Sequence, residues 1–264
     1  MKIGFIGLGN MANAMIVGIL KQGLIKPEEI YGASKTRETA EKMRQRYGIY
    51  AGTDNKAVAM GADFLFLAVK PVYFPEVIAE IKDAVGENTV VISIAAGKTM
   101  AYIEGLFGRS IKLLRCMPNT PALVGEGCTA YARGDLVTDE EAGGAELLLR
   151  SFGTVSLVPE SLMDAVVGVS GSSPAYVFLF IEAMADAAVL AGMPRKQAYE
   201  MAAQSVLGSA KMVLETGLHP GVLKDMVCSP GGTTIEAVKV LEECGMRAAV
   251  MNAMEACIDK SKNM

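Results

Sequence analysis

Two glycine-rich stretches, far apart in the sequence, have residue types suited to binding anions. One reads GLGNMA at residues 7–12, and the other reads SPGGTT at residues 229–234. In each, glycines precede a run with helical spacing, so unpaired backbone N–H groups at a helix N-terminus face the turn. The first suits the phosphates of a dinucleotide, and the second suits a small carboxylate or phosphate. Together they indicate a small reductase.

The first stretch follows an apolar, strand-like run at residues 2–6 and opens a helical run at 11–22. In this context Gly7 permits a tight turn, Gly9 lets the backbone approach a pyrophosphate, and Ala12 lets the helix pack closely on the strand. A glycine motif alone would be a weak signal. The strand and helix around it make a dinucleotide site the specific prediction.

The residues after the second strand-like run, 29–33, indicate which dinucleotide is bound. NAD enzymes usually place Asp or Glu there to accept from the ribose hydroxyls. This chain instead has Ser34, Lys35, Thr36 and Arg37. Two cations and two hydroxyls suit the additional 2′-phosphate of NADP, so we predict a clear preference for NADPH, with NADH accepted less well. The alternative is a solvated loop and helix start.

Two further strand-like runs end in residues that suit a ligand, because ligands lie at the carboxyl ends of strands in such sheets. The run 62–69 is followed by Lys70, a candidate cofactor contact, and by Pro71, which ends the strand. The run 89–95 is followed by Ala96, whose small size leaves room for a nicotinamide ring. The alternatives are an exposed lysine at a strand end and an ordinary turn.

The SPGGTT stretch precedes helical apolar spacing at residues 235–241. Thr233 and Glu236 match a capping box with Thr233 as the N-cap, which leaves the Thr234 hydroxyl free for other work. The alternative is a well-made helix start with no ligand. Two adjacent glycines are more than a cap requires, so we favour an anion site.

Composition narrows the class of protein. Of 264 residues, 51% are hydrophobic, and the net charge is −4 without a long run of one sign. This argues against nucleic acid or an anionic membrane as the main partner. The single histidine, His219, argues against a Ser-His-Asp triad and against a histidine-built metal site. Five cysteines without CxxC pairing are expected to be reduced, and no secretory pattern precedes the first strand, so we expect a cytoplasmic protein.

Strand-like and helical runs alternate in the first part of the chain, which predicts a doubly wound, mainly parallel Rossmann-type sheet. After about residue 158 only helical spacing remains, so we predict an α/β fold with domains at 1–159 and 160–264. Residues 174–191 are apolar nearly all round but contain Glu182 and Asp186, which favours a buried helix over a membrane span. A helical domain this small predicts burial against a second copy, in a homodimer or larger assembly.

Taken together, the chain resembles the pyrroline-5-carboxylate reductase family over its whole length. The resemblance rests on residues 5–12, 68–71, 115–121, 169–176 and 223–235. The last block, LKDMVCSPGGTTI, is the most specific. Ser173 stands where the family often has glycine, which puts little in doubt because serine is also small.

The resemblance implies that NADPH reduces the cyclic imine 1-pyrroline-5-carboxylate to L-proline, the last step of proline biosynthesis. It implies cofactor contacts at Ile6, Gly7, Leu8, Gly9, Asn10, Met11, Ser34, Asn55, Val69, Lys70 and Ala96. The pattern arguments add Ala12, Lys35, Arg37, Ala68 and Pro71. Substrate contacts are implied at Glu160, Thr233 and Thr234, and the anion-site argument adds Ser229, Gly231 and Gly232. Our candidate catalytic residue is Thr234, hydrogen-bonded to the ring nitrogen.

The resemblance also implies an intertwined dimer, in which the nucleotide domain of one subunit meets the SPGGTT turn of the other. Rings of five dimers occur in some members. A first alternative, a β-hydroxyacid dehydrogenase, needs a catalytic lysine in a K-x-x-x-N pattern, which Lys211 does not match. A second alternative is a non-catalytic NADPH sensor whose SPGGTT turn binds a regulatory anion.

Overall fold

The computed structural model describes residues 1–264 as two compact units. Unit 1 comprises Met1–Ser172 and Cys257–Met264, and unit 2 comprises Ser173–Ala256. The expected boundary at Glu160 lies within unit 1, because the segment after Glu160 packs on the sheet. There Met163 and Val166 form a buried cluster with Ala130 and Ala132.

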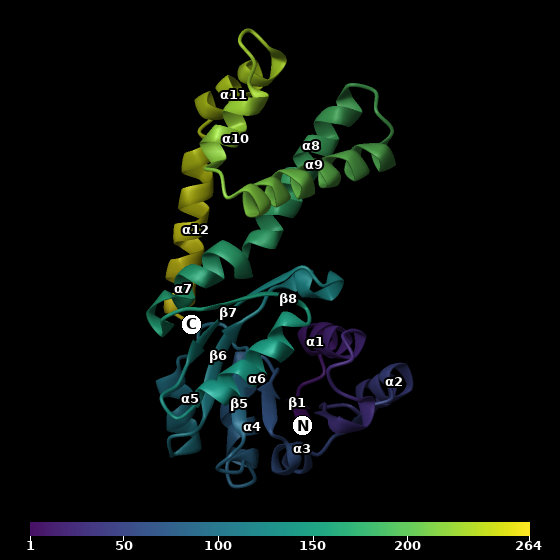
Figure 1. Cartoon of the computed structure of the whole chain (residues 1–264), viewed down its shortest axis with the longest axis vertical. Coiled ribbons are helices and arrows are strands. Elements are labelled where there is room, and N and C mark those ends of the chain that lie inside the picture. The colour runs from purple at the N-terminus through teal and green to yellow at the C-terminus, as the bar shows by residue number, and fades with distance from the viewer. The chain divides into compact units, whose positions relative to one another are not determined.

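Unit 1 is built on one eight-stranded sheet with the order β3-β2-β1-β4-β5-β6-β7-β8 (Figure 1). The strands are β1 (Ile3–Ile6), β2 (Ile30–Ala33), β3 (Tyr50–Gly52), β4 (Phe64–Leu67), β5 (Val90–Ser93), β6 (Leu113–Met117), β7 (Gly127–Arg133) and β8 (Gly153–Leu157). All neighbours are parallel except β6 and β7. The predicted mainly parallel, doubly wound sheet is confirmed, and β3, β7 and β8 extend it beyond the expected strands.

Helices cover both faces of this sheet (Figure 1). They are α1 (Asn10–Lys21), α2 (Arg37–Tyr47), α3 (Asn55–Gly61), α4 (Phe74–Ile81), α5 (Met100–Phe107), α6 (Asp139–Arg150) and the short α7 (Met163–Val166), which runs into a π-helical turn at Val167–Gly171. The central strands are buried on both sides, so their residues alternate between two apolar clusters. In β4, for example, Phe66 joins the cluster with α1 and α6, while Leu65 joins the cluster with α4 and α5. This explains why the strand-like runs are apolar throughout.

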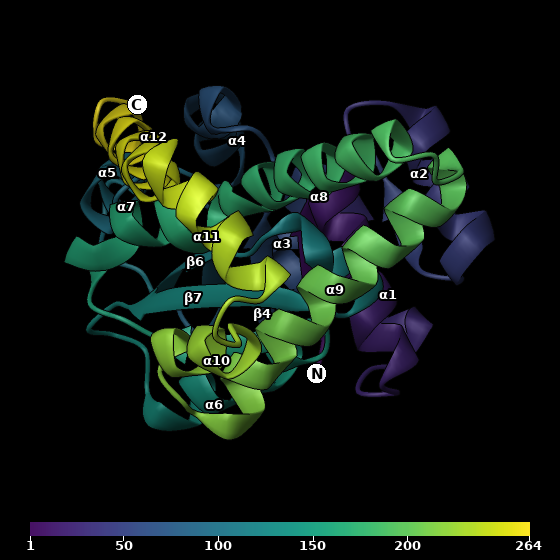
Figure 2. The ribbon, with the colours of Figure 1, turned by 90° about the horizontal axis from the view of Figure 1, so that it is seen from above.

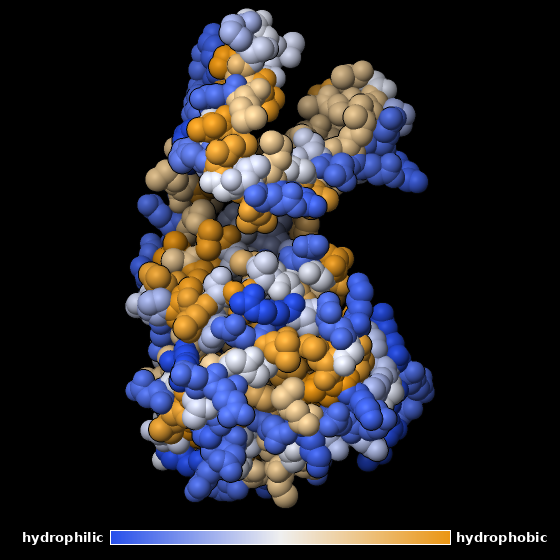
Figure 3. Space-filling model, in the orientation of Figure 1, coloured by the Kyte–Doolittle hydropathy of each residue, from blue (hydrophilic) through white to orange (hydrophobic).

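Unit 2 is entirely helical. Its helices are α8 (Ser173–Leu190), α9 (Arg195–Thr216), α10 (Pro220–Val227), α11 (Thr233–Glu243) and most of α12 (Met246–Lys262). Helices α8 and α9 pack side by side (Figure 2). The hydrophobic residues that unit 2 buries are three alanines, Ala185, Ala198 and Ala202, whereas Phe178 and Leu179 are more than half exposed. Apolar side chains also gather on the surface of α10 and α11 (Figure 3).

The helical stretch Glu160–Leu190 is long and apolar enough to cross a bilayer, judged by length and composition alone. A core helix of a soluble protein can pass the same test. The stretch contains two carboxylates within α8, Glu182 and Asp186, the second of which is ion-paired with Arg195. Within one chain the apolar side chains of α8, such as Phe178 and Leu179, therefore stay largely exposed beside these carboxylates.

Candidate functional site

The strand register brings the predicted cofactor residues to one edge of the sheet. Ile6 of β1 pairs with Ala33 of β2 and with Leu67 of β4, and Leu67 pairs with Ser93 of β5. The residues that follow these four therefore emerge in a row at the carboxyl edge. Adjacent strands lie about 4.8 Å apart, so the row from β2 to β5 spans roughly 14 Å. An extended dinucleotide can lie across such an edge, where the strand order reverses between β1 and β4.

The turn between β1 and α1 has the form that a pyrophosphate requires. Gly7 has φ of 95°, and a Cβ atom there would lie 2.6 Å from the carbonyl oxygen of Ala68, so only glycine fits without strain. Gly9 is the N-cap of α1, and no atom lies within 4 Å of the position its Cβ would take. No side chain caps α1, so its first N–H groups are free to bind an anion.

Beside this turn lies a cavity of about 430 Å³. It is lined by the predicted cofactor residues Gly7, Leu8, Gly9, Ser34, Lys35, Asn55, Val69 and Lys70. The other predicted cofactor residues lie outside its lining: Ile6, Asn10, Met11, Ala12, Arg37, Ala68, Pro71 and Ala96. Ile6 and Ala12 have buried side chains, so only their backbones could face a ligand. Arg37 begins α2 and lines a neighbouring hollow.

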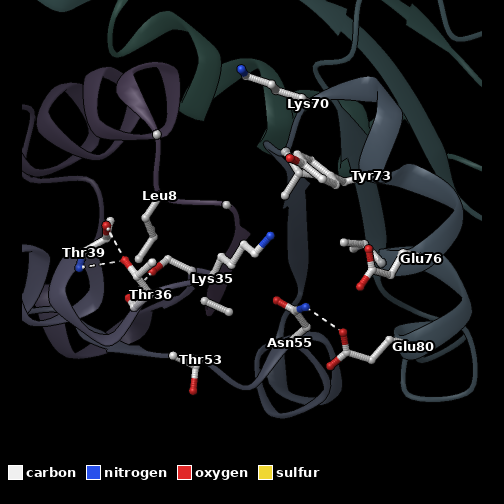
Figure 4. Close-up of a pocket in the computed structure, with 16 residues that line it drawn as sticks. Leu8, Lys35, Thr36, Thr39, Thr53, Asn55, Lys70, Tyr73, Glu76 and Glu80 are labelled. Carbon is white, nitrogen blue, oxygen red and sulfur yellow. Dashed lines mark hydrogen bonds between the residues drawn. The ribbon is translucent and has the colours of Figure 1, made fainter.

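Ser34 and Lys35 form one wall of the cavity. The Ser34 hydroxyl donates to the carbonyl oxygen of Thr36 at 2.7 Å. The Lys35 side chain extends into the cavity, with its ammonium 5.6 Å from the ring centre of Tyr73 (Figure 4). Lys70, in the loop after β4, also lines the cavity, with its ammonium directed away from Lys35 (Figure 4). The wall of Ser34 and Lys35 offers a cation and a hydroxyl group but no carboxylate, which fits a nucleotide phosphate.

The opposite wall comes from the predicted contact Asn55, at the start of α3, and from the N-cap and one face of α4, which were not predicted from the sequence. It contributes Tyr73, Glu76, Val77 and Glu80, and the Asn55 amide donates to Glu80 at 2.8 Å (Figure 4). These four positions follow the i, i+3, i+4, i+7 spacing of one helix face, which was the available signal. Thr36, Thr39 and Thr53 also line the cavity beyond the expected set. The carboxylates make this wall suited to the uncharged base and sugar rather than to phosphate.

The SPGGTT turn lies in unit 2, where it joins α10 to α11. Gly231 has φ of 69°, which favours glycine. A Cβ atom on Gly232 would collide with the hydroxyl of Ser229, and the Gly232 N–H donates to the Ser229 carbonyl at 3.0 Å. Gly231 is thus favoured by its backbone conformation, and Gly232 by its close contact with Ser229.

The predicted capping box at this turn is wrong. Gly232, with extended backbone, is the N-cap of α11, and Thr233 is already its first helical residue. Because the helix begins one residue earlier than we expected, Thr233 lies within its first turn and makes no capping hydrogen bond. The first turn of α11 therefore keeps uncapped N–H groups, and it carries the side chains of both Thr233 and Thr234.

Glu160 lies in unit 1, at the turn after β8. Its Oε1 atom accepts from the backbone N–H of Met100 at 2.7 Å and from Nη1 of Arg115 at 3.0 Å. The Arg115 side chain is only 6% exposed. Glu160 thus has structural partners within unit 1, and its contact with substrate stays a prediction.

Comparison with known proteins finds a matching family model for each half of the chain. Residues 160–264 match the family model for pyrroline-5-carboxylate reductase dimerisation, and residues 2–97 match the one for NADP oxidoreductase, coenzyme F420-dependent. The chain is 51% identical to a pyrroline-5-carboxylate reductase of Escherichia coli, with 100% of this chain and 98% of that protein covered. It is 47% identical to one of Methanosarcina acetivorans, covering 100% and 97%.

Solved structures agree with these relatives. A pyrroline-5-carboxylate reductase from Coxiella burnetii superposes with a TM-score of 0.92 at 36% identity, covering 99% of this chain and 97% of that one. The Plasmodium falciparum pyrroline carboxylate reductase, crystallised with NADP bound, has a TM-score of 0.91 at 33% identity, covering 100% and 97%. Since the relatives match from end to end, and the dinucleotide edge and the SPGGTT turn lie in the same chain, this chain belongs to the pyrroline-5-carboxylate reductase family.

Proposed function

We propose that this chain uses NADPH to reduce the C=N bond of 1-pyrroline-5-carboxylate, giving L-proline and NADP⁺. The observation that carries the proposal is the uncapped α1 turn at Gly7 and Gly9, beside a cavity wall with Ser34 and Lys35 and no carboxylate at the end of β2. Family membership supplies the substrate class. When bound, the nicotinamide would supply the hydride, and the protein would align donor and acceptor.

In this proposal the edge of the sheet binds the cofactor in three parts. The first N–H groups of α1 bind the pyrophosphate, and Ser34 and Lys35 bind the 2′-phosphate. The loop after β5, with Ala96, supports the nicotinamide. The register of β2, β1, β4 and β5 supports this order, because it places the three parts in a row along one edge.

The SPGGTT turn would bind the substrate. Backbone N–H groups of residues 231–233 hold the carboxylate, and the Thr234 hydroxyl bonds the ring nitrogen. Protonation of that nitrogen makes the neighbouring carbon electrophilic, and water can supply this proton before binding. No strong acid is then needed from the protein, in keeping with the lack of a histidine or acid pair at this turn.

Two copies would complete each active site, with the nucleotide edge from one subunit and the SPGGTT turn from the other. The match of residues 160–264 to a dimerisation family and the exposed apolar side chains of unit 2 support the dimer. Rings of five dimers would be a further step of assembly. We also propose a cytoplasmic location.

The test is an assay that follows loss of reduced-nicotinamide absorbance with the racemic imine and either NADPH or NADH. We expect steady turnover with the imine and a higher kcat/KM with NADPH. Absence of turnover, with NADPH binding retained, would favour a sensor. Turnover of 3-hydroxy acids with NAD, and none with the imine, would favour a β-hydroxyacid dehydrogenase.

A further inference from the structure

A partly buried ion pair lies next to the strand that ends where we place the nicotinamide. Arg115 is in the middle of β6 and pairs in register with Ser93, the last residue of β5. Its side chain is 6% exposed, and Nη1 donates to Glu160 at 3.0 Å. A buried guanidinium needs such a partner, so the position of each side chain depends on the other.

The same oxygen of Glu160 also accepts from the N–H of Met100, the first residue of α5, at 2.7 Å. That N–H would otherwise have no partner within the helix. The N-cap Thr99 accepts from the Tyr102 N–H at 3.1 Å. The first turn of α5 is therefore held by two side chains, and only one of them, Glu160, comes from outside the helix.

The loop that leads into this turn is the one that carries Ala96. It runs from Ser93 to Met100, so Arg115 lies beside its beginning through the strand register, and Glu160 holds its end. The residues to which we assign the pyrophosphate and the 2′-phosphate follow other strands, β1 and β2. A change in Arg115 should therefore shift the nicotinamide support without touching the groups that bind the rest of the cofactor.

We propose that Arg115 is a positioning residue for hydride transfer, which acts by orienting the Glu160 carboxylate onto the first turn of α5. This inference rests on the proposed function. Hydride transfer is sensitive to donor–acceptor geometry, and a misplacement of about 1 Å can cost roughly 100-fold in rate. The Arg115–Glu160 pair keeps the Ala96 loop in the position in which the nicotinamide lies against the substrate carbon.

The test compares Arg115→Met with the wild-type enzyme in its native assembly. We expect kcat to fall about 10- to 100-fold, while the NADPH Kd and the KM for the imine change less than about threefold. With NADPH deuterated at the transferred position, the isotope effect on kcat should rise, because hydride transfer becomes more rate-limiting. Arg115→Lys, which keeps a cationic donor, should recover much of the loss.

Lys112→Met is the matched control. Lys112 directly precedes β6, at the end of the strand away from the Ala96 loop, and it pairs with Glu141 at 2.5 Å. The Lys112–Glu141 and Arg115–Glu160 pairs are both shielded from solvent to a large extent. Each variant therefore loses a comparable ion pair at or next to β6. We expect Lys112→Met to keep wild-type kcat and isotope effect, whatever its melting temperature.

Three results would overturn the inference while the wild type remains active. One is an unchanged kcat and isotope effect in Arg115→Met. Another is an equal kinetic loss in Lys112→Met, which would indicate general destabilisation. The third is a raised KM for the imine at constant kcat, which would place the effect in substrate binding. Absence of imine turnover in the wild type would instead overturn the proposed function, and this inference with it.

Discussion

The two units differ in where their apolar side chains go, although both are rich in them. Unit 1 buries large residues such as Phe5, Phe66 and Phe74 on the two faces of its sheet. Unit 2 buries alanines and leaves Phe178 and Leu179 exposed. Unit 1 therefore contains a complete core within one chain, whereas the helices of unit 2 require another surface to exclude water from their apolar faces.

The two glycine-rich turns show the same difference on a smaller scale. Gly7 lies close to the carbonyl of Ala68, the residue after β4, so the neighbouring strand of unit 1 restricts the shape of the turn. Gly231 and Gly232 are shaped by contacts within the SPGGTT turn. One turn is thus shaped by a surrounding sheet, and the other is shaped locally at the start of a helix.

The largest effect should come from placing a charge on the exposed face of unit 2. Leu179 is 67% exposed on α8, and burying a leucine at an interface contributes about 1.5–3 kcal/mol. A symmetric dimer loses this twice, so Leu179→Asp should raise the dimer dissociation constant about 10²- to 10⁴-fold. Sedimentation velocity at several concentrations measures the change.

Met60→Asp provides the control, because Met60 is 72% exposed on α3 of unit 1 and should leave the assembly intact. An unchanged dissociation constant in Leu179→Asp would show that this part of α8 lies outside the interface. A folded wild-type monomer, stable at micromolar concentration, would contradict the conclusion that the helices of unit 2 require another surface.

Within unit 2, removal of the Thr234 hydroxyl should have the next largest effect. Thr234→Ala should lower kcat/KM for the imine about 10- to 100-fold, the scale of one hydrogen bond at a developing charge. Thr234→Ser keeps the hydroxyl and should stay within a few-fold of wild type. Steady-state kinetics with saturating NADPH distinguish the two, and unchanged kinetics in Thr234→Ala would exclude the proposed role.

Within unit 1, a carboxylate at the end of β2 should weaken the preference for NADPH. In Ser34→Asp the new charge repels a 2′-phosphate and can accept from the ribose hydroxyls of NADH. We expect kcat/KM with NADPH to fall about tenfold, with NADH less affected. Equal kcat/KM for the two cofactors in both wild type and variant would rule out the assignment of Ser34.

The smallest expected effect is on the free energy of unfolding, through a hydrogen bond between Tyr131 and Glu146 in unit 1. The Tyr131 hydroxyl donates to Glu146 at 2.5 Å, which lowers the pKa of Glu146 from its usual 4.5. Burial, together with this bond, raises the pKa of Tyr131 to about 12. The lowered Glu146 pKa means that the pair stabilises the fold above the unfolded-state pKa and ceases to do so as pH falls through the lower folded value.

Tyr131→Phe should therefore lower the free energy of unfolding by about 1 kcal/mol at neutral pH, and the difference should shrink as pH falls through the lowered folded-state pKa of Glu146. Urea unfolding at fixed protein concentration measures it. Tyr47→Phe is the matched control, since Tyr47 donates to the neutral amide of Asn13 at 2.6 Å and its loss should not depend on pH in this range. If Tyr131→Phe stayed equally destabilised in acid, the contribution of this hydrogen bond would not depend on the charge of Glu146.

The sequence predicted the central strands well because each is a run of apolar residues buried on both faces. It did not reveal β3, which has three residues, none of them buried. It also missed β7 and β8, which follow the last apolar run and complete the sheet beyond its parallel part. Strand β7 pairs with β6, and β8 pairs with β7, through contacts between distant residues that no local pattern records.

What the sequence determined by itself was local chemistry: a glycine turn between strand and helix, no carboxylate after β2, and an SPGGTT turn before a helix. Only the tertiary structure decided that Arg115, Glu160 and Met100 share one contact, and that a face of α4 lines the cofactor cavity. It also moved the α11 cap from Thr233 to Gly232. The physical reason is that turn and strand propensities act between near neighbours in the chain. Which distant side chains meet instead depends on strand register and on the packing of helices against the sheet.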